Sequence, residues 1–247
     1  MSSHHQIEPQ QTPEYWSVIT DMLSQAVTGE LIGMLNYTSM VTMNEEPEGM
    51  LDAVDHANSE RRHAMAFMQA AQDLGLDLIV DLQANYWKCI REVFLKWAGR
   101  NDLIGCILIQ DFMLEGFAIS IYKQIGNAVN GSLGELFTRI ARQEESHLEP
   151  AITFLQGEMN KSPVDFEAKV KRVHEDAMTV LAEMVAPEDH HGHCQLCSDK
   201  CVKEMLPHAG LEICTLRGNA LNFYIKSLDR LGLPGDRTLG WVANLPV

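Results

Sequence analysis

The stretch Glu60-Arg61-Arg62-His63 has a counterpart later in the chain, Glu144-Glu145-Ser146-His147. Residues three apart lie on one face of a helix, so each glutamate can point at the same spot as its histidine. A single glutamate precedes each pair: Glu30 lies 30 residues before Glu60, and Glu115 lies 29 residues before Glu144. Two such pairs and two single glutamates in this order predict a carboxylate-bridged di-metal site inside a four-helix bundle.

The donor atoms of this set indicate which metals it suits. The candidate ligands are Glu30, Glu60, His63, Glu115, Glu144 and His147. Hard oxygen donors with one imidazole per metal suit iron or manganese, and four carboxylate charges balance two divalent cations. A set of thiolates would instead suggest zinc or an iron-sulfur cluster. The donor set therefore predicts iron or manganese, and it accepts two irons or an iron-manganese pair.

The surroundings of the glutamates separate a metal site from a solvated helix face. A lone Glu-x-x-His is common by chance on an exposed helix. Glu115, however, lies in the middle of a nearly continuous apolar run from Cys106 to Tyr122. A helix that is apolar on most sides is buried, and a carboxylate there must be neutralised by a metal, a proton or a cation. Two copies of the motif in such a context favour the metal site.

Length and composition indicate one domain. The chain has 247 residues, 46% of them hydrophobic, and no long linker rich in Gly, Ser or Pro divides it. We expect a single domain over 1–247, with a Cys/His-rich insertion at 186–214. The first residues are polar and no eighteen consecutive residues are apolar, so we expect no membrane span and a cytoplasmic location. A net charge of −15 disfavours nucleic-acid binding.

Helix signals recur along the chain, and strand-like alternation is absent, so the predicted fold is all-α. Helices are expected near 13–43, 47–74, 83–98, 101–125, 132–157, 163–185 and 211–231. Three start signals support these boundaries: Thr12 before Pro13, Asn101 ahead of an apolar run, and Ser162 before Pro163.

Several segments around the candidate ligands resemble a known family. They are Asn36-Tyr37 after Glu30, Glu60 to Phe67, Cys106 to Gln110, Glu115 to Tyr122, Glu144 to Leu148, and Ser227 to Gly232. In these segments the chain is similar to the aldehyde-deformylating oxygenases, also called long-chain fatty aldehyde decarbonylases. That family consists of ferritin-like di-iron proteins. The resemblance implies a ferritin-like four-helix bundle with extra helices and a C-terminal extension that contains the Cys/His region.

The resemblance also implies an activity. A member of this family activates dioxygen at two iron ions and converts a long-chain aldehyde into an alkane and formate. Its electrons come from an external donor such as ferredoxin. By similarity, the six residues named above are the iron ligands, and Glu60 and Glu144 are the bridging carboxylates.

Residues near the ligands are candidates for catalytic or supporting roles, and we name Tyr122, Gln110 and Asp111 as catalytic candidates. Tyr122 either lines the cavity or donates to a ligand carboxylate, and Gln110 matches the family. Asp111 lies four residues before Glu115, on the same face of a regular helix. It is either a hydrogen-bond partner of a ligand or a recognition group for a polar or cationic substrate. His56 is expected to be an ordinary helix-surface histidine.

A second region has six Cys and His side chains in twelve residues, from His190 to Cys201. The residues that form a possible second metal site are His193, Cys194, Cys197 and Cys201. Structural zinc is the leading interpretation, with Cys214 as an alternative fourth ligand. An iron-sulfur cluster, a redox dithiol and a loop of reduced cysteines are the alternatives.

Three classes of function fit these observations. The leading hypothesis is a di-iron oxygenase acting on a long-chain aldehyde or, alternatively, on a polar substrate such as an amine or an amino-acid derivative. The second is a ferritin-like peroxidase or iron-handling protein. The third is a non-catalytic metal-binding protein, which the complete ligand set disfavours.

Overall fold

The computed structural model describes residues 12–186 and 201–245, and every regular element within them is helical. The long helices are α1 (Pro13–Val41), α2 (Pro47–Asp73), α3 (Asn85–Ala98), α5 (Glu115–Ala128), α6 (Gly131–Lys161), α7 (Pro163–Met184) and α9 (Ile213–Arg230). The shorter ones are α4 (Leu103–Ile107), the π-helix η1 (Leu108–Leu114), α8 (Val202–Met205), the 3₁₀-helix η2 (Leu206–Ala209) and α10 (Gly235–Ala243). The predicted all-α fold is confirmed.

The helix starts follow local rules, with one correction. Thr12 caps α1, because its side chain accepts a hydrogen bond of 3.2 Å from the backbone N–H of Tyr15. The prediction that Asn101 starts the next long helix is wrong by one residue. Asp102 is the cap and accepts from the backbone N–H of Gly105 at 2.9 Å, while Asn101 adopts a left-handed φ of 53°. Asparagine tolerates that conformation better than most residues, which suits it to the turn before a helix.

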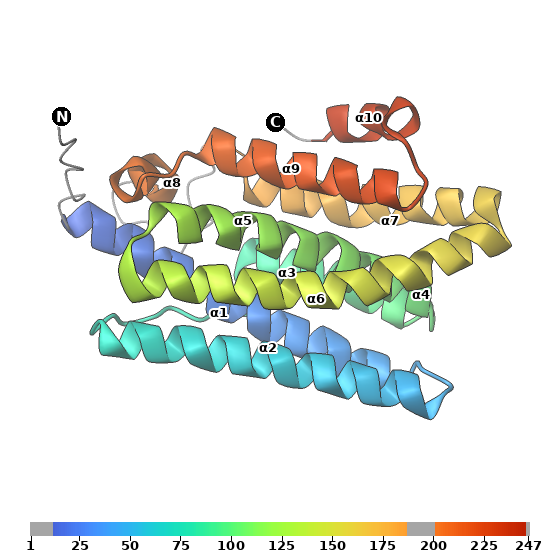
Figure 1. Ribbon diagram of the computed structural model, residues 1–247, viewed down its shortest axis with the longest axis horizontal. Coiled ribbons are helices and arrows are strands. Elements are labelled where there is room, and N and C mark those ends of the chain that lie inside the picture. Colours follow the sequence, from blue (N-terminus) through green and yellow to red (C-terminus); the bar gives the residue numbers. More distant parts are fainter. Residues whose placement is uncertain (1–11, 187–200, 246–247) are drawn as a thin grey trace, which may run out of the picture.

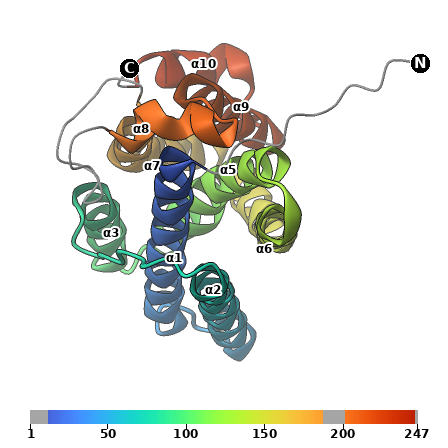
Figure 2. The same cartoon turned by 90° about the vertical axis from the view of Figure 1, so that its left-hand side faces the viewer.

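Four long helices surround the site. In Figure 1, α2 runs along the edge of the molecule beside α1, and α5 lies with α6. Helix α9 packs on α5, and α7 packs against α3 and η1. The end-on view of Figure 2 places α1 near the middle, with α3 to its left, α2, α5 and α6 toward its right, and α7 and α8 above it. Side chains on α1, α2, α5 and α6 therefore face a common interior.

The hydrophobic core divides into two clusters, and the predicted ligands lie between them along the helices. On α1, Val18 to Val27 belong to one cluster and Tyr37 and Met40 to the other, with Glu30 in the gap. On α6, Ile140 and Leu148 belong to different clusters, and Glu144 lies between them. The polar layer is thus held between two apolar ones, which keep water away from it.

One continuous helical segment, Leu103–Ala128, crosses the centre of the protein as α4, η1 and α5. By length and composition this segment could cross a membrane, because its most apolar stretch of eighteen residues has a mean hydropathy of 1.7. However, 72% of that stretch is buried inside the protein. Such burial is typical of a core helix. The π-helical turns of η1 come directly before Glu115, whose backbone N–H bonds to the carbonyl of Gln110, five residues back.

Candidate metal centre

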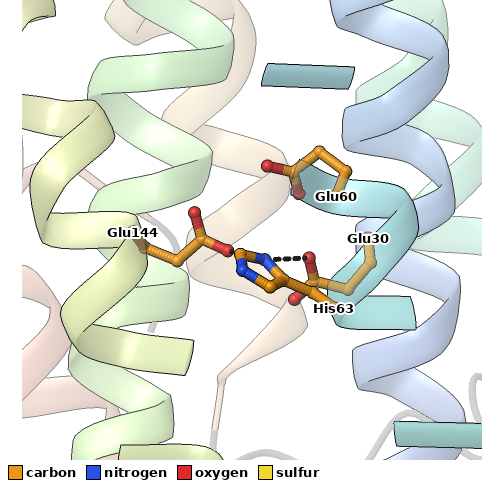
Figure 3. Close-up of side chains that lie close together, drawn as sticks. All are labelled: Glu30, Glu60, His63 and Glu144. Atoms are coloured by element: carbon orange, nitrogen blue, oxygen red, sulfur yellow. Dashed lines mark hydrogen bonds and ion pairs between the residues drawn. The ribbon is translucent and has the colours of Figure 1, made fainter. Parts of the chain in front are cut away.

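The six predicted ligands converge at the middle of the bundle. Two groups have ligand atoms that all lie within 4.8 Å of one another, and Glu60 and Glu144 belong to both. The groups are Glu30, Glu60, His63 and Glu144, and Glu60, Glu115, Glu144 and His147. Figure 3 shows the first group, in which Glu144 from α6 faces Glu30 on α1 and the pair on α2. Two overlapping groups with two shared carboxylates fit a bridged di-metal site.

His63 faces its carboxylate partners directly. Its Nδ1 lies 2.7 Å from Glu144 Oε1 and 3.2 Å from Glu30 Oε2. Its Nε2 lies 3.1 Å from Oε1 of Gln143. Because that oxygen is an acceptor, the proton of a neutral His63 ring belongs on Nε2, and the Nδ1 lone pair points at the cluster. An outward hydrogen bond of this kind orients a histidine for metal binding.

His147 is placed differently, because its Nδ1 has no hydrogen-bond partner. Nδ1 lies 2.9 Å from Glu144 Oε2, 3.8 Å from Glu60 Oε1 and 4.0 Å from Glu115 Oε2, but none of these contacts has hydrogen-bond geometry. These three carboxylate oxygens are also buried without a partner. Buried polar atoms normally find partners, so four converging orphan atoms are the strongest sign that a cation belongs here.

The pKa values in the cluster show how costly its negative charge is. Burial, and then the charges of Glu144 and Glu115, raise the pKa of Glu60 well above its ordinary value. Burial and Glu144 likewise raise the pKa of Glu115. Burial lowers the pKa of His63, but Glu144 and Glu30 raise it more, to about 10. The carboxylates therefore favour protons or cations among them, as the donor set predicted.

Two tyrosines hold the outer glutamates. Tyr122 on α5 donates to Glu30 Oε1 at 2.7 Å. Tyr37 on α1 approaches Glu115 Oε1 at 2.8 Å and Asp111 Oδ1 at 2.9 Å. Each hydroxyl is buried, so it fixes one oxygen of its glutamate and leaves the other oxygen directed at the cluster. Tyr122 thus lies beside a ligand and also lines the cavity described below.

A chain of side-chain amides continues the support of Glu115. Arg91 on α3 donates to Asn36 Oδ1, and Asn36 Nδ2 donates to Gln110 Oε1 at 2.6 Å. Gln110 Nε2 then donates to Glu115 Oε1 at 3.3 Å. The π-helix explains why Gln110, five residues before Glu115, reaches it: the wider turns bring residues five apart onto one face.

The same register change moves Asp111 away from the position expected for it. Asp111 does not line the cavity. Its Oδ1 bonds to Tyr37 and lies 4.0 Å from Nδ1 of His56. Burial, and then the charge of Glu115, raise the pKa of Asp111 to about 7. This geometry supports the interpretation of Asp111 as a hydrogen-bond partner near the ligands.

His56 points inward, contrary to the expected helix-surface position. Its ring centroid lies 4.5 Å from that of His147 and 4.8 Å from that of Tyr37. Burial, and then the charge of His147, lower the pKa of His56 to about 4. The sequence hid this placement because Asp52, Asp55 and Asn58 make this part of α2 resemble an exposed helix.

Two supporting residues were missed by the sequence analysis. Gln143 directly precedes Glu144, and a polar residue beside a ligand was the only signal for its contact with His63. Arg91 lies on a helix that no motif connected with the site, and only the packing of α3 against α1 brings it to Asn36.

An apolar cavity of about 260 Å³ adjoins the metal centre. Four of the six predicted ligands line it: Glu30, Glu60, Glu115 and Glu144. Its walls are mostly apolar side chains from α1, α5, α7 and the C-terminal helices, such as Phe117, Ile121, Ile125 and Leu216. An apolar cavity that meets a few converging polar groups is the usual form of a small-molecule site.

Comparison with known proteins identifies the family. The model of the long-chain fatty aldehyde decarbonylase family matches residues 14–205. The chain belongs to this family. The match covers all six candidate ligands and both tyrosines beside them. The six residues that converge in the structure of this long-chain fatty aldehyde decarbonylase homologue therefore lie within the segment that matches the family.

A solved structure shares the fold of this family member. It is described as protein 19 with aldehyde deformylating oxidase activity from Synechococcus, and the TM-score is 0.80. The alignment covers 94% of this chain and 97% of that chain, at 15% sequence identity. A likeness at this identity shows the fold alone, which is the predicted ferritin-like helical bundle.

Most of the possible second metal site lies outside the described residues. His193, Cys194 and Cys197 are in that part of the chain, whereas Cys201 is buried at the start of α8 and lines the cavity. Cys214, the alternative ligand, is exposed on α9. Zinc or an iron-sulfur cluster in this member of the decarbonylase family stays a prediction.

Proposed function

We propose that this chain is a non-haem di-iron oxygenase that converts a long-chain aldehyde into an alkane and formate. Glu30, Glu60, His63, Glu115, Glu144 and His147 would hold the two metal ions. The proposal rests on one observation. Four ligand atoms without hydrogen-bond partners lie together where an apolar cavity adjoins the metal centre. Membership of the long-chain fatty aldehyde decarbonylase family supports the substrate class.

The reaction fixes what must reach the site. One aldehyde, one dioxygen, four electrons and three protons give one alkane, one formate and one water. The bond between the carbonyl carbon and the alkyl chain breaks, and the carbonyl carbon leaves as formate. We propose that an external reductant such as ferredoxin supplies the electrons. When bound, iron supplies the redox chemistry and the open coordination positions that dioxygen activation requires.

The protein's own side chains supply position and shelter. Tyr122 and Tyr37 hold Glu30 and Glu115 in place, and Gln110 adds a second donor to Glu115. The apolar walls bind the alkyl chain and bring the carbonyl end to the carboxylates. They also exclude water, which protects a reactive centre from side reactions.

The test is metal content followed by single-turnover chemistry. The purified protein is loaded anaerobically with ferrous iron and exposed to oxygen with a panel of long-chain aldehydes and amines. Products are read by mass spectrometry. Two irons per chain with alkane and formate would support the proposal. Oxygen uptake with an oxidised amine would change the substrate, and two irons without substrate-dependent turnover would favour peroxide reduction or iron handling.

A pair of variants ties the activity to the site. Glu115→Ala should abolish iron-dependent oxygen consumption while leaving the helical circular dichroism spectrum unchanged, because it removes a ligand from one group. Glu145→Ala is the matched control on α6, since Glu145 is only half-buried, lies outside both ligand groups and pairs only with Lys123 in the described part of the chain. An active Glu115→Ala enzyme would refute the ligand assignment.

Three further expectations complete the proposal. We propose that the chain is one domain, with residues 186–214 as an insertion in it, and that it acts in the cytoplasm. Cys194→Ser with Cys197→Ser tests the insertion separately. If the variant loses only the insertion's share of metal and keeps its activity, the Cys/His region is structural.

A further inference from the structure

The cavity has a polar end far from the metal centre. Along α1 it extends from Glu30 to Asp21 and Gln25. Asp21 precedes Glu30 by nine residues, which is about 14 Å along a helix axis. Between these ends the walls are apolar, with Ala118, Ile121 and Ile125 of α5 among them. A chain-shaped ligand with one end at the metal centre would therefore reach Asp21 with its other end.

The polar end is built as a connected network. Trp87 Nε1 donates to Gln25 Oε1 at 2.6 Å, and Gln25 Nε2 donates to Asp21 Oδ1 at 3.1 Å. The Trp87 ring also packs against Gly29, where a Cβ would lie 2.9 Å from the ring. Gln25 is therefore held from one side and directs its amide N–H at the carboxylate. Among the described residues, the second oxygen of Asp21 has no hydrogen-bond donor.

A lysine from the C-terminal part of the chain lines the same end. Lys203 on α8 donates to the backbone carbonyl of Ala186 at 2.8 Å and acts electrostatically on Asp21. Burial nevertheless raises the pKa of Asp21 to about 6, although Gln25 and Lys203 lower it. The Asp21 side chain is half-buried, so a hydrogen-bond donor arriving from the cavity would replace the water that this carboxylate otherwise needs.

We propose that Asp21, Gln25 and Trp87 form a recognition site for a hydroxyl group at the far end of the substrate. The inference rests on the proposed function, since it takes the aldehyde end to lie at the metal centre. A hydroxyl can donate to the second oxygen of Asp21 and accept from a neighbouring N–H. An ammonium group fits less well, because Lys203 already brings a positive charge to this end.

The distance between the two ends sets the length of such a substrate. An extended alkyl chain is a zigzag, so each bond of about 1.5 Å advances only about 1.25 Å, and about ten carbons with a terminal oxygen span about 13 Å, close to the distance between the two ends. The site therefore prefers an ω-hydroxy aldehyde of about ten carbons over an unsubstituted aldehyde of the same size. A cavity that is apolar throughout would show the opposite preference.

Binding to the full-length protein separates these two cases without any turnover. Titration calorimetry compares 1,10-decanediol with 1-undecanol, which have the same number of non-hydrogen atoms and differ by a terminal hydroxyl in place of a methyl group. A site that bonds the hydroxyl should bind the diol at least tenfold more tightly. Without such a site, undecanol should bind more tightly, because its terminal methyl group is apolar.

Variants assign the preference to Asp21. Asp21→Leu should remove the preference for the diol or reverse it. Asp52→Leu replaces an exposed aspartate on α2, outside the cavity, and is the matched control that should keep the wild-type ratio. If Asp21→Leu does not fold by circular dichroism, Asp21→Asn replaces it, and a smaller but significant loss of the preference is expected.

Each outcome decides the inference. A diol preference that depends on Asp21 supports it. Equal binding, tighter binding of undecanol, or no binding of either alcohol overturns it. Turnover measurements then show whether the recognition site and the proposed deformylation activity stand or fall independently. Alkane and formate from undecanal, without a preference for 10-hydroxydecanal, would keep deformylation and overturn the inference. An Asp21-dependent diol preference in a protein that deformylates neither aldehyde would keep the recognition site and overturn the activity.

Discussion

The two ends of the cavity stabilise their carboxylates in different ways. At the metal centre four carboxylates are buried together, and four of the ligand atoms there have no hydrogen-bond partner. At the distal end a single carboxylate, Asp21, receives a hydrogen bond from Gln25 and the charge of Lys203. One half-buried charge can be stabilised by neighbouring polar groups, whereas four close buried charges need cations. The number of carboxylates therefore decides whether polar neighbours are enough to stabilise them or cations are needed.

The largest expected effect is at the shared carboxylates. Glu60→Ala should remove both metals, because Glu60 belongs to both ligand groups. Glu30→Ala should leave one metal per chain, since Glu30 belongs only to the group that includes His63. Inductively coupled plasma mass spectrometry of ferrous-loaded protein measures the difference. Equal metal loss in the two variants would contradict the bridging role of Glu60.

Metal loading should also stabilise the protein strongly. A ligand present at about a thousand times its Kd adds about 4 kcal/mol to the free energy of unfolding, or about 10 °C in Tm for a chain of this size. Anaerobic differential scanning calorimetry, with and without ferrous iron, measures the shift, and a chelator should reverse it. In Glu60→Ala the shift should disappear. An unchanged wild-type Tm would mean that protons alone neutralise the carboxylates.

A smaller effect is expected at the tyrosines that hold the outer glutamates. Tyr37→Phe and Tyr122→Phe each remove one hydroxyl that contacts a ligand. Loss of such an outer hydrogen bond lowers metal affinity by about 10- to 100-fold. Glu115 keeps its bond from Gln110 in the first variant, whereas no other described side chain donates to Glu30 Oε1 in the second. Competition with a chelator should therefore show the larger loss for Tyr122→Phe, and the reverse order would contradict this assignment.

The sequence predicted that the six Glu and His side chains would converge, because its signal is repeated. Each Glu-x-x-His pair fixes two side chains on one helix face, and the single glutamates stand out in apolar helices such as the one that carries Glu115. Helix boundaries were also close, apart from the cap at Asp102 and the short C-terminal helix α10.

The parts that were not predicted depend on geometry that the sequence pattern does not show. A continuous apolar run has the same pattern in an α-helix and in a π-helix. The sequence therefore did not show that η1 would bring Gln110, rather than Asp111, next to Glu115. Asp21 and Gln25 are a polar pair four residues apart, which is common on an exposed helix face. Only the tertiary fold brings Trp87 and Lys203 to them.

The smallest expected effect is at the distal end and depends on pH. Burial raises the pKa of Asp21 from 3.8 to about 6, so between these values the folded protein holds a proton that the unfolded chain has released. The free energy of unfolding therefore falls as the pH rises through this window. Asp21→Asn should equal the wild type at pH 4 and be more stable by about 1–2 kcal/mol at pH 7.5.

Urea unfolding at the two pH values tests this prediction, with Asp52→Asn as the exposed control. A gain in stability for Asp21→Asn that appears only at high pH would mean that this carboxylate is kept at a cost to stability, as expected for a group that serves binding. A loss of stability at pH 7.5 would instead show that Lys203 compensates the charge fully. The distal end would then be a structural ion pair, and only the metal centre would hold charge that a ligand must neutralise.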